Sequence, residues 1–478
     1  MRTGHAGRPR YTERMKTFKP YNPDQLFLLP PALRDWLPEG HLALFISDVV
    51  EALDLTPIFV AYEDGDGRGQ PPYHPAMMVK LLVYAYCMGK PSSRQIERAT
   101  YEEIPYRILA ANQHPDHDSL AAFRQRHMAA LAGLFGQVLQ LCQRAGLVRL
   151  GHVALDGTKI LANASKHKAM SYGRMGEAEQ KLQQEIAALL AQAAAVDAAE
   201  DAQQGTDRCG DALPAELARR ESRLAKIREA KAALEAEATA QAVQAAAAAQ
   251  ARLTERAQQV RETGRNPTGR PPTVPDPTTA TPRPTAQRTC TDPESRIMKD
   301  GATKRCVQAY NAQAVVDSQA QIIVAAAVTQ QANEQAQLVP MLQHVQATLD
   351  RKPTQASADA GSFSATQVTD PALRGIDLYV PPDRQHHGGL SPSDSDPPPP
   401  DAPVIAQMRH KLQTVAGQAI YALRKAIVEP VFGQIKAARG FRRFAFRGQA
   451  KVTAEWLLIC LTHNLLKLFR ARQRLPAA

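Results

Sequence analysis

The sequence predicts an α/β fold, a sheet with flanking helices that is preceded by an all-α domain and interrupted by a long helical hairpin. Residues 21–150 place apolar side chains at helical spacing between short breakers, which predicts helices. Short apolar runs typical of strands begin at residue 151 and return after residue 292. Between them, residues 176–263 are rich in Ala, Glu, Gln and Arg, which favour helix. These three observations define the expected fold class.

The N-terminal part is expected to be an all-α domain behind a mobile basic tail. Residues 1–20 are polar and basic, and terminal segments of this kind are usually mobile. Within residues 21–150, the stretches GHLALFISDVVEALDL and AMMVKLLVYAYCMG have the apolar pattern of packed helices. Arginines in SSRQIERA and FRQRH suit contact with phosphate groups, and a solvated helix face has the same composition. Both interpretations stay open.

The insertion over residues 176–263 is predicted to form two long helices in an antiparallel hairpin. Its apolar face is mostly Ala with spaced Leu, so the packing is expected to be shallow. The segment lacks clean a/d heptads, which favours a spacer over a dimerisation coiled coil. The Pro- and Thr-rich linker at 264–291 and the loop at 384–405 lack core residues, and both are expected to be disordered.

Two aspartates follow short predicted strands and stand close to a glycine. Asp156 ends the run HVALD before Gly157, and Asp359 ends a second strand two residues before Gly361. An aspartate at the carboxyl end of a strand can face a bound ion or phosphate. Asp-Gly is also a common turn dipeptide, so for either aspartate taken alone a simple turn is the favoured interpretation.

A third acid, Glu429, stands alone in a basic and apolar helical stretch. Lys425 and Lys436 fall on the same predicted helix face as Glu429, because steps of three and four residues return to one side. Taken alone, this pattern is that of a salt-bridged surface helix. From residue 421 to the end there are twelve Lys and Arg against two acids, which accounts for nearly all of the formal net charge of +11. Such a basic tail indicates a polyanionic partner.

The order strand–Asp, β-hairpin, strand–Asp and Glu-bearing helix, followed by a basic tail, resembles the RNase H-like nucleotidyl transferases. In particular, the chain resembles the DDE transposases of bacterial insertion sequences with an InsH-type helical domain in front. The resemblance implies a catalytic domain formed by residues 151–175 and 292–478. The segments that carry it are 71–87, 156–175, 310–317, 358–364, 421–444 and 463–468.

The resemblance implies a mixed five-stranded sheet in which the first strand lies beside the fourth. Asp156, Asp359 and Glu429 would then be the catalytic acids and the metal ligands. Three carboxylates in one place repel each other unless cations neutralise them. Mg²⁺ (or Mn²⁺), two ions per active site, would supply that charge and support an in-line phosphoryl displacement.

The family's C-terminal signature places Tyr, Arg, Glu and Lys on one helix, and Tyr421, Glu429 and Lys436 match it. Arg424 lies five residues before the glutamate, where the family spacing is four, and Lys425 occupies that position. Which of these two cations contacts phosphate therefore stays open. The residues expected to bind DNA or phosphate are Tyr421, Arg424, Lys425, Lys436, Arg439, Arg442 and Arg443.

The resulting expectation is a transposase that binds the ends of its insertion sequence and catalyses metal-dependent cleavage and strand transfer of DNA. Its partner would be double-stranded DNA, bound as a homodimer, with no small-molecule substrate and no membrane. The alternatives are an inactive DNA-binding remnant or repressor, and a nuclease that cuts without joining. No secretory signal and no apolar window of membrane length are recognised, and the six cysteines are scattered. A cytoplasmic, nucleoid-associated protein is expected.

Overall fold

The structure of the protein is a computed structural model that describes residues 32–62, 71–166, 169–204, 213–301, 303–383, 398–399 and 401–474. The side chains of residues 193–204 and 213–215 are not described. The tail expected to be mobile, residues 1–20, lies outside the described residues, as does most of the loop expected to be disordered at 384–405.

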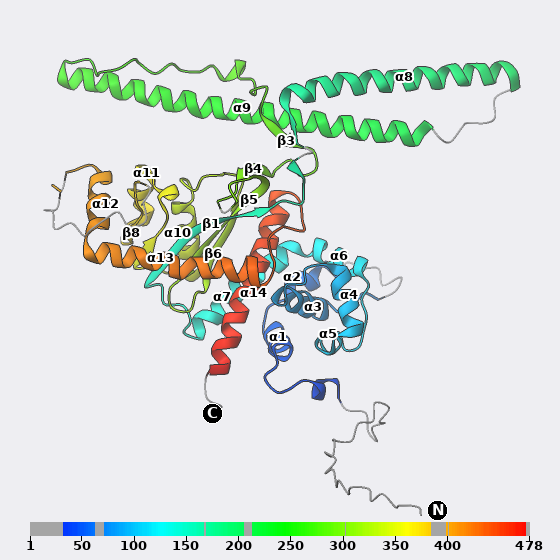
Figure 1. Cartoon of the computed structure of the whole chain (residues 1–478), viewed down its shortest axis with the longest axis horizontal. Coiled ribbons are helices and arrows are strands. Elements are labelled where there is room, and N and C mark those ends of the chain that lie inside the picture. The colour runs from blue at the N-terminus through cyan, green and yellow to red at the C-terminus, as the bar shows by residue number, and fades with distance from the viewer. Residues whose placement is uncertain are drawn as a thin grey trace, which may run out of the picture.

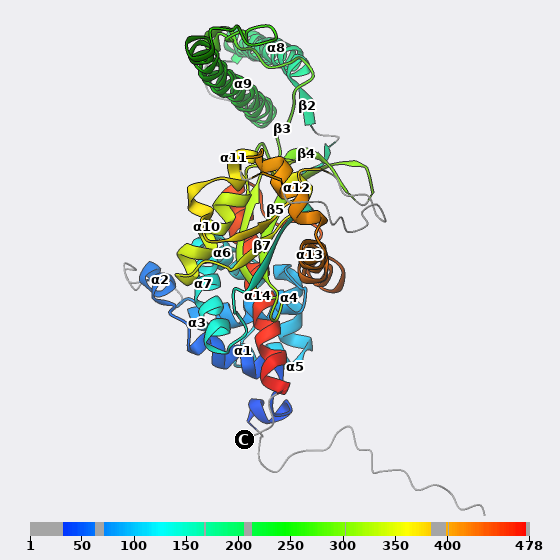
Figure 2. The same cartoon turned by 90° about the vertical axis from the view of Figure 1, so that its left-hand side faces the viewer.

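The described chain forms three tiers (Figures 1 and 2). A group of N-terminal helices lies at one end, a curled mixed sheet with its helices lies in the middle, and a pair of long helices lies at the other end. This arrangement confirms the predicted fold class, an RNase H-like α/β sheet with a helical N-terminal region and a helical insertion.

The N-terminal helices share one hydrophobic core with the sheet. Their bounds are η1 Leu33–Trp36, α1 Leu42–Glu51, α2 Thr56–Phe59, η2 Val60–Tyr62, α3 Pro75–Cys87, α4 Ser93–Glu102, α5 Ile104–Leu109, α6 His117–Arg126 and α7 Met128–Arg144. Helix α3 is buried on almost every side, and α7 packs along the C-terminal helix α14, Gln449–Arg474. Gly89, just after α3, has φ +71° and lies so near the Arg439 backbone that a Cβ would come within 2.4 Å of its carbonyl oxygen.

The sheet has six strands, one more than the five that the resemblance implied. They are β1 His152–Leu161, β4 Arg296–Lys299, β5 Cys306–Asp317, β6 Ile323–Thr329, β7 Gln355–Ser357 and β8 Asp377–Tyr379. Strand β1 pairs antiparallel with β5 and parallel with β7, and β7 pairs parallel with β8. Strands β4 and β6 both pair antiparallel with β5. With β4 taken as the additional strand, the first of the other five, β1, lies beside the fourth, β7, as the resemblance implied.

Strand β1 is longer than the sequence predicts. The run HVALD was expected to end at Asp156, whereas β1 continues to Leu161. The reason is that β5 pairs with it along this whole length, from Val153 opposite Asp317 to Leu161 opposite Ala309. On the other edge, β7 ends at Ser357. Asp156 therefore stands at the end of the β1–β7 pairing and in the middle of β1.

Helices flank the sheet and complete its core. They are α10 Leu338–Leu349, η5 Ala360–Ser362, α11 Ala365–Val368, η6 Pro371–Leu373, α12 Val404–Gln413, α13 Val415–Gly433 and the π-helical turn η7 Gln434–Ala438, followed by α14. The Asn464 side chain on α14 bonds to the amide and the carbonyl of Ile323, both at 2.8 Å, and so satisfies the start of β6. Among the described helices, α14 is long and apolar enough to cross a membrane, and 67% of that apolar window is buried inside the protein.

The insertion leaves the sheet domain through β2 Ala169–Ser171 and returns through β3 Gln287–Thr289, which pair antiparallel. Helices α8 Tyr172–Gln204 and α9 Leu213–Thr263 lie between them and bury a small apolar cluster that includes Met175 and Ile227. Residues 264–291, expected to be a disordered linker, instead run along α9 and include η4 Pro277–Thr279. Arg256 on α9 donates to the carbonyls of Pro267 and Gly269, both at 2.9 Å. These hydrogen bonds hold residues 264–291 against the helix, although the segment has no core residues.

Candidate active site

Asp156 and Asp359 occupy matching positions on neighbouring parallel strands. Ala154 is paired with Ser357, and each aspartate lies two residues further along its chain. Asp359 stands before the short helix η5, where its Oδ1 accepts a hydrogen bond from Ser362 Oγ at 3.0 Å. Strand pairing therefore brings together two residues that are about two hundred positions apart in the sequence.

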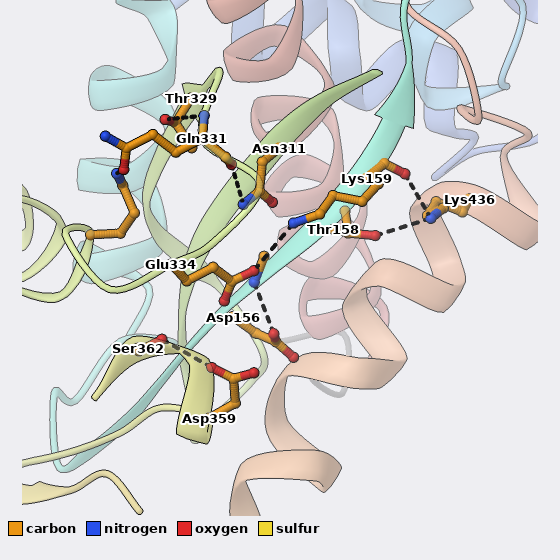
Figure 3. A network of polar contacts seen from close by, with 12 residues as sticks. Asp156, Thr158, Lys159, Asn311, Thr329, Gln331, Glu334, Asp359, Ser362 and Lys436 are labelled. Carbon is orange, nitrogen blue, oxygen red and sulfur yellow. Dashed lines mark hydrogen bonds and ion pairs between the residues drawn. The ribbon is translucent and has the colours of Figure 1, made fainter. Parts of the chain in front are cut away.

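Glu334 completes the group as a third carboxylate. It lies between β6 and α10, and its side chain is 10% exposed. One carboxylate oxygen each from Asp156, Glu334 and Asp359 can be chosen so that all lie within 4.8 Å of one another. Figure 3 shows the three side chains converging from three separate parts of the chain. The sequence-based prediction did not include Glu334.

Gly157 makes room for this arrangement. A Cβ on Gly157 would lie 2.2 Å from Glu334 Oε1 and 2.2 Å from Gln313 Nε2. The Gly157 amide also donates to Asp156 Oδ1 at 2.8 Å. The Asp-Gly pair is thus required here by a close approach of Glu334 to the backbone of β1, and it does not form a turn.

Two cations border the carboxylates, and a third, Lys436, is held further along β1. Arg424 Nη1 on α13 lies 3.1 Å from Asp156 Oδ2, and Lys159 Nζ lies 3.8 Å from Glu334 Oε1. Lys436 Nζ donates to Thr158 Oγ1 and to the Lys159 carbonyl, both at 3.0 Å (Figure 3). Of the two cations between which the sequence could not choose, Arg424 is buried against Asp156 and Lys425 is exposed.

Two of the carboxylates, Asp156 and Glu334, hold their protons more tightly than usual. Burial raises the pKa of Asp156 to about 7, and the charges of Glu334 and Asp359 add to the effect while Arg424 opposes it. Burial and the neighbouring Asp359 also raise the pKa of Glu334. Burial lowers the pKa of Lys159, although the negative charges of Glu334, Asp359 and Asp156 act in the opposite direction. The neighbouring cations therefore do not fully compensate the negative charge that the group carries when all three carboxylates are ionised.

Unpartnered oxygens surround the same point. Within the described part of the chain, the buried oxygens Glu334 Oε2, Asn311 Oδ1 and Gln313 Oε1 have no hydrogen-bond partner, and neither has the amide nitrogen Gln313 Nε2. Buried polar atoms normally have one, so oxygens left over at a carboxylate cluster need an explanation. A hard divalent cation with oxygen ligands fits this donor set.

Glu429 does not join the carboxylate group, contrary to the expected geometry. It is exposed on α13, and the group within 4.8 Å contains Asp156, Glu334 and Asp359. The buried face of α13 carries Arg424, Ile427 and Val428. Glu429 follows Arg424 by five residues, which turns it by about 140° around the helix, away from the side that faces Asp156.

The other residues expected to contact DNA occupy different environments. Arg439 is 9% exposed and donates to Thr462 Oγ1 at 2.8 Å and to the Ile459 carbonyl at 3.2 Å, so it serves the packing of α14 and is not available to DNA in this structure. Tyr421 is half-buried, with its ring 5.8 Å from the Arg424 guanidinium carbon. Arg442 and Arg443 are exposed.

The order of the sheet and the carboxylate cluster beside β1 and β7 define an RNase H-like protein. Comparison with family models adds two matches: residues 31–126 match a transposase domain (DUF772), and residues 402–469 match a transposase DDE domain. Comparisons with curated proteins and with solved structures gave no match. The two domain matches support a DDE transposase of an insertion sequence.

The DDE match and the carboxylate cluster are independent observations. The match covers α12, α13 and most of α14, including Arg424, Glu429 and Lys436, and begins only after Asp156, Glu334 and Asp359 in the chain. The family implies use of a divalent metal, and the cluster offers oxygen ligands for one. One sequence signal could have found Glu334: it is the sole acid between Asp317 and Asp350, and it stands five residues after the end of strand β6.

Proposed function

We propose that this transposase binds the ends of its insertion sequence and catalyses metal-dependent cleavage and strand transfer of DNA. The observation that carries the proposal is the meeting of Asp156, Asp359 and Glu334 at the end of the β1–β7 pairing. This arrangement concentrates negative charge where a sheet of this type presents its ligands. It belongs to a chain whose C-terminal basic region can hold a polyanion.

Asp156, Glu334 and Asp359 would hold Mg²⁺ or Mn²⁺, and two ions would be needed for the full reaction. When bound, the metal supplies activation of water or of a 3′-hydroxyl and stabilisation of the leaving oxygen. Lys159 keeps Glu334 oriented by their ion pair, and Arg424 holds Asp156 from the side of α13. Glu429, which the family resemblance makes the third catalytic acid, is exposed and open to DNA or metal on α13.

Lys436 on η7, and Arg442 and Arg443 in the loop that follows, would contact DNA phosphates. Two ends must be processed together, so a homodimer on double-stranded DNA is part of the proposal. A cytoplasmic, nucleoid-associated location goes with this substrate.

The test uses purified protein and linear DNA that carries the terminal sequences of the element. We expect Asp156→Asn and Asp359→Asn to abolish cleavage while both variants still bind this DNA. Strand transfer by the wild-type protein would exclude a nuclease that only cuts, and cleavage of any kind would exclude an inactive remnant. Mg²⁺-dependent nicking that survives in Asp156→Asn would overturn the assignment.

A further inference from the structure

The base of the α8–α9 insertion carries a basic groove of about 570 Å³ between α9 and the β2–β3 ribbon. Its lining includes four cations, Arg174 at the start of α8 and Arg219, Arg223 and Lys226 on α9, and it contains no acid. All four side chains are exposed. We call these four residues and the space between them the hairpin groove.

The cations of the hairpin groove differ from the other cations on these helices. Arg220 pairs with Glu185 at 3.1 Å, and Arg228 and Lys231 pair with Glu179 at 2.9 and 3.0 Å. By contrast, Arg174, Arg219, Arg223 and Lys226 have no ion pair or side-chain hydrogen bond with another described residue. Glu179 and Glu185 are thus paired with cations outside the groove, and no acid lines the groove itself.

A second basic groove of about 550 Å³ adjoins the first. Its cations are Lys166, Arg305, Arg443 and Arg447, all exposed, and we call it the strand groove. Thr291, just after β3, lines both grooves, so the two basic surfaces meet at this residue. The basic grooves of the catalytic domain and of the insertion are therefore neighbours.

The strand groove also leads back to the carboxylates. Leu161 lines it and is the last residue of β1, five positions beyond Asp156. Five residues of extended strand span about 17 Å, which corresponds to about five base pairs of duplex DNA. A duplex whose end lies at Asp156 could thus pass over the strand groove and reach the hairpin groove.

We propose that the α8–α9 insertion is a DNA-binding element that holds the duplex flanking the reacting end, with the hairpin groove contacting its phosphates. The proposal rests on the proposed function, because it takes the DNA to be the transposon end. Arg219, Arg223 and Lys226 follow at steps of four and three residues, so they share one helix face over about 10 Å. Duplex DNA carries about six negative charges over that length. A row of cations therefore suits duplex DNA better than it suits a small anion. A plain spacer has no need of this row.

The experiment compares two triple variants of the full chain, each of which loses three positive charges from α9. The test variant is Arg219→Gln with Arg223→Gln and Lys226→Gln, and the control is Arg220→Gln with Arg228→Gln and Lys231→Gln. Affinity for an end-bearing duplex of about 40 base pairs, or about 140 Å, is measured by fluorescence anisotropy from low to moderate salt. Each phosphate contact adds about 0.9 to the slope of log affinity against log salt, so the test variant should lose about 2.7 from the slope.

The control should keep the wild-type slope within about 1, because its cations are already paired with acids. An unchanged slope in the test variant, or equal losses in both variants, would overturn the proposal. A photo-crosslinking residue placed at Ser222, which also lines the hairpin groove, gives a measurement that needs no charge removal. Crosslinks to the duplex are expected, and their absence would also count against the proposal. If the wild-type protein itself bound DNA without salt dependence, the proposed function would fail instead.

Discussion

Asp156 and Asp359 stand opposite one another, two residues beyond the Ala154–Ser357 pair of the parallel strands β1 and β7. Register alone therefore brings two carboxylates to the same edge, before any side-chain interaction is considered. Glu334 reaches them from the connection between β6 and α10, and Gly157 leaves the space that it fills. The position of the cluster is thus set by the sheet. The carboxylates repel one another in the folded protein, and a bound cation would reduce that repulsion.

The first prediction separates Glu334 from Glu429 by metal binding without DNA. We expect Glu334→Gln to weaken Mn²⁺ binding by tenfold or more, of the order of the 10- to 100-fold losses seen on removing groups close to a metal. Glu429→Gln should bind Mn²⁺ as the wild-type protein does, because Glu429 lies on the outer face of α13. Isothermal titration calorimetry measures both.

Cleavage by the same two variants adds a second readout. Loss of cleavage in Glu429→Gln with unchanged metal affinity would assign this residue to the DNA-bound state, as the family resemblance implies. Equal metal affinity in Glu334→Gln and the wild-type protein would remove Glu334 from the ligand set.

The second prediction concerns stability and pH in metal-free protein. The pKa of Asp156 is about 7 in the folded protein, against an ordinary value of 3.8. Between these values the folded state keeps a proton that the unfolded chain has lost, so the free energy of unfolding falls as pH rises from 4 to 7 and levels off above that. The loss attributable to Asp156 is about 4 kcal/mol at most.

Thermal unfolding at a series of pH values measures this dependence. Mg²⁺ should raise the melting temperature more at pH 8 than at pH 5, because binding requires the ionised carboxylates. Asp156→Asn should flatten the profile between pH 4 and 7. A variant profile identical to the wild-type one would show that another group causes the dependence.

The sequence pointed to Asp156 and Asp359 because each follows an apolar strand with a glycine nearby, and because the order of these segments resembles the DDE transposases. Glu334 has no such pattern around it, and its place depends on how the connection after β6 folds over Gly157. The orientation of Glu429 depends on which face of α13 packs on β1. That face is selected by Ile427, Val428 and the Arg424–Asp156 pair, which only the tertiary structure reveals.

The third prediction uses the space at Gly157. We expect Gly157→Ala to displace Glu334, because the added Cβ would lie 2.2 Å from its Oε1. The result should be a loss of about 1–3 kcal/mol in the free energy of unfolding, together with weaker Mn²⁺ binding. Gly136→Ala is the matched control, since nothing lies within 4 Å of a Cβ there and the site is inside α7. It should be neutral or stabilise by up to about 1 kcal/mol. Wild-type metal affinity in Gly157→Ala would show that Glu334 is not held against β1.

The last prediction tests which cation of α13 acts on the carboxylates. Arg424 lies 3.1 Å from Asp156 and is buried, so Arg424→Gln should raise the pKa of Asp156 further by removing the charge that opposes burial. The step in the pH–stability profile should then move to higher pH. Lys425→Gln removes the same charge from the neighbouring, exposed position and should leave the step unchanged. Chemical denaturation of both variants between pH 4 and 9 decides the question. Equal shifts of the step would mean that the whole basic helix acts on Asp156. No shift in either variant would show that Arg424 does not affect the pKa of Asp156.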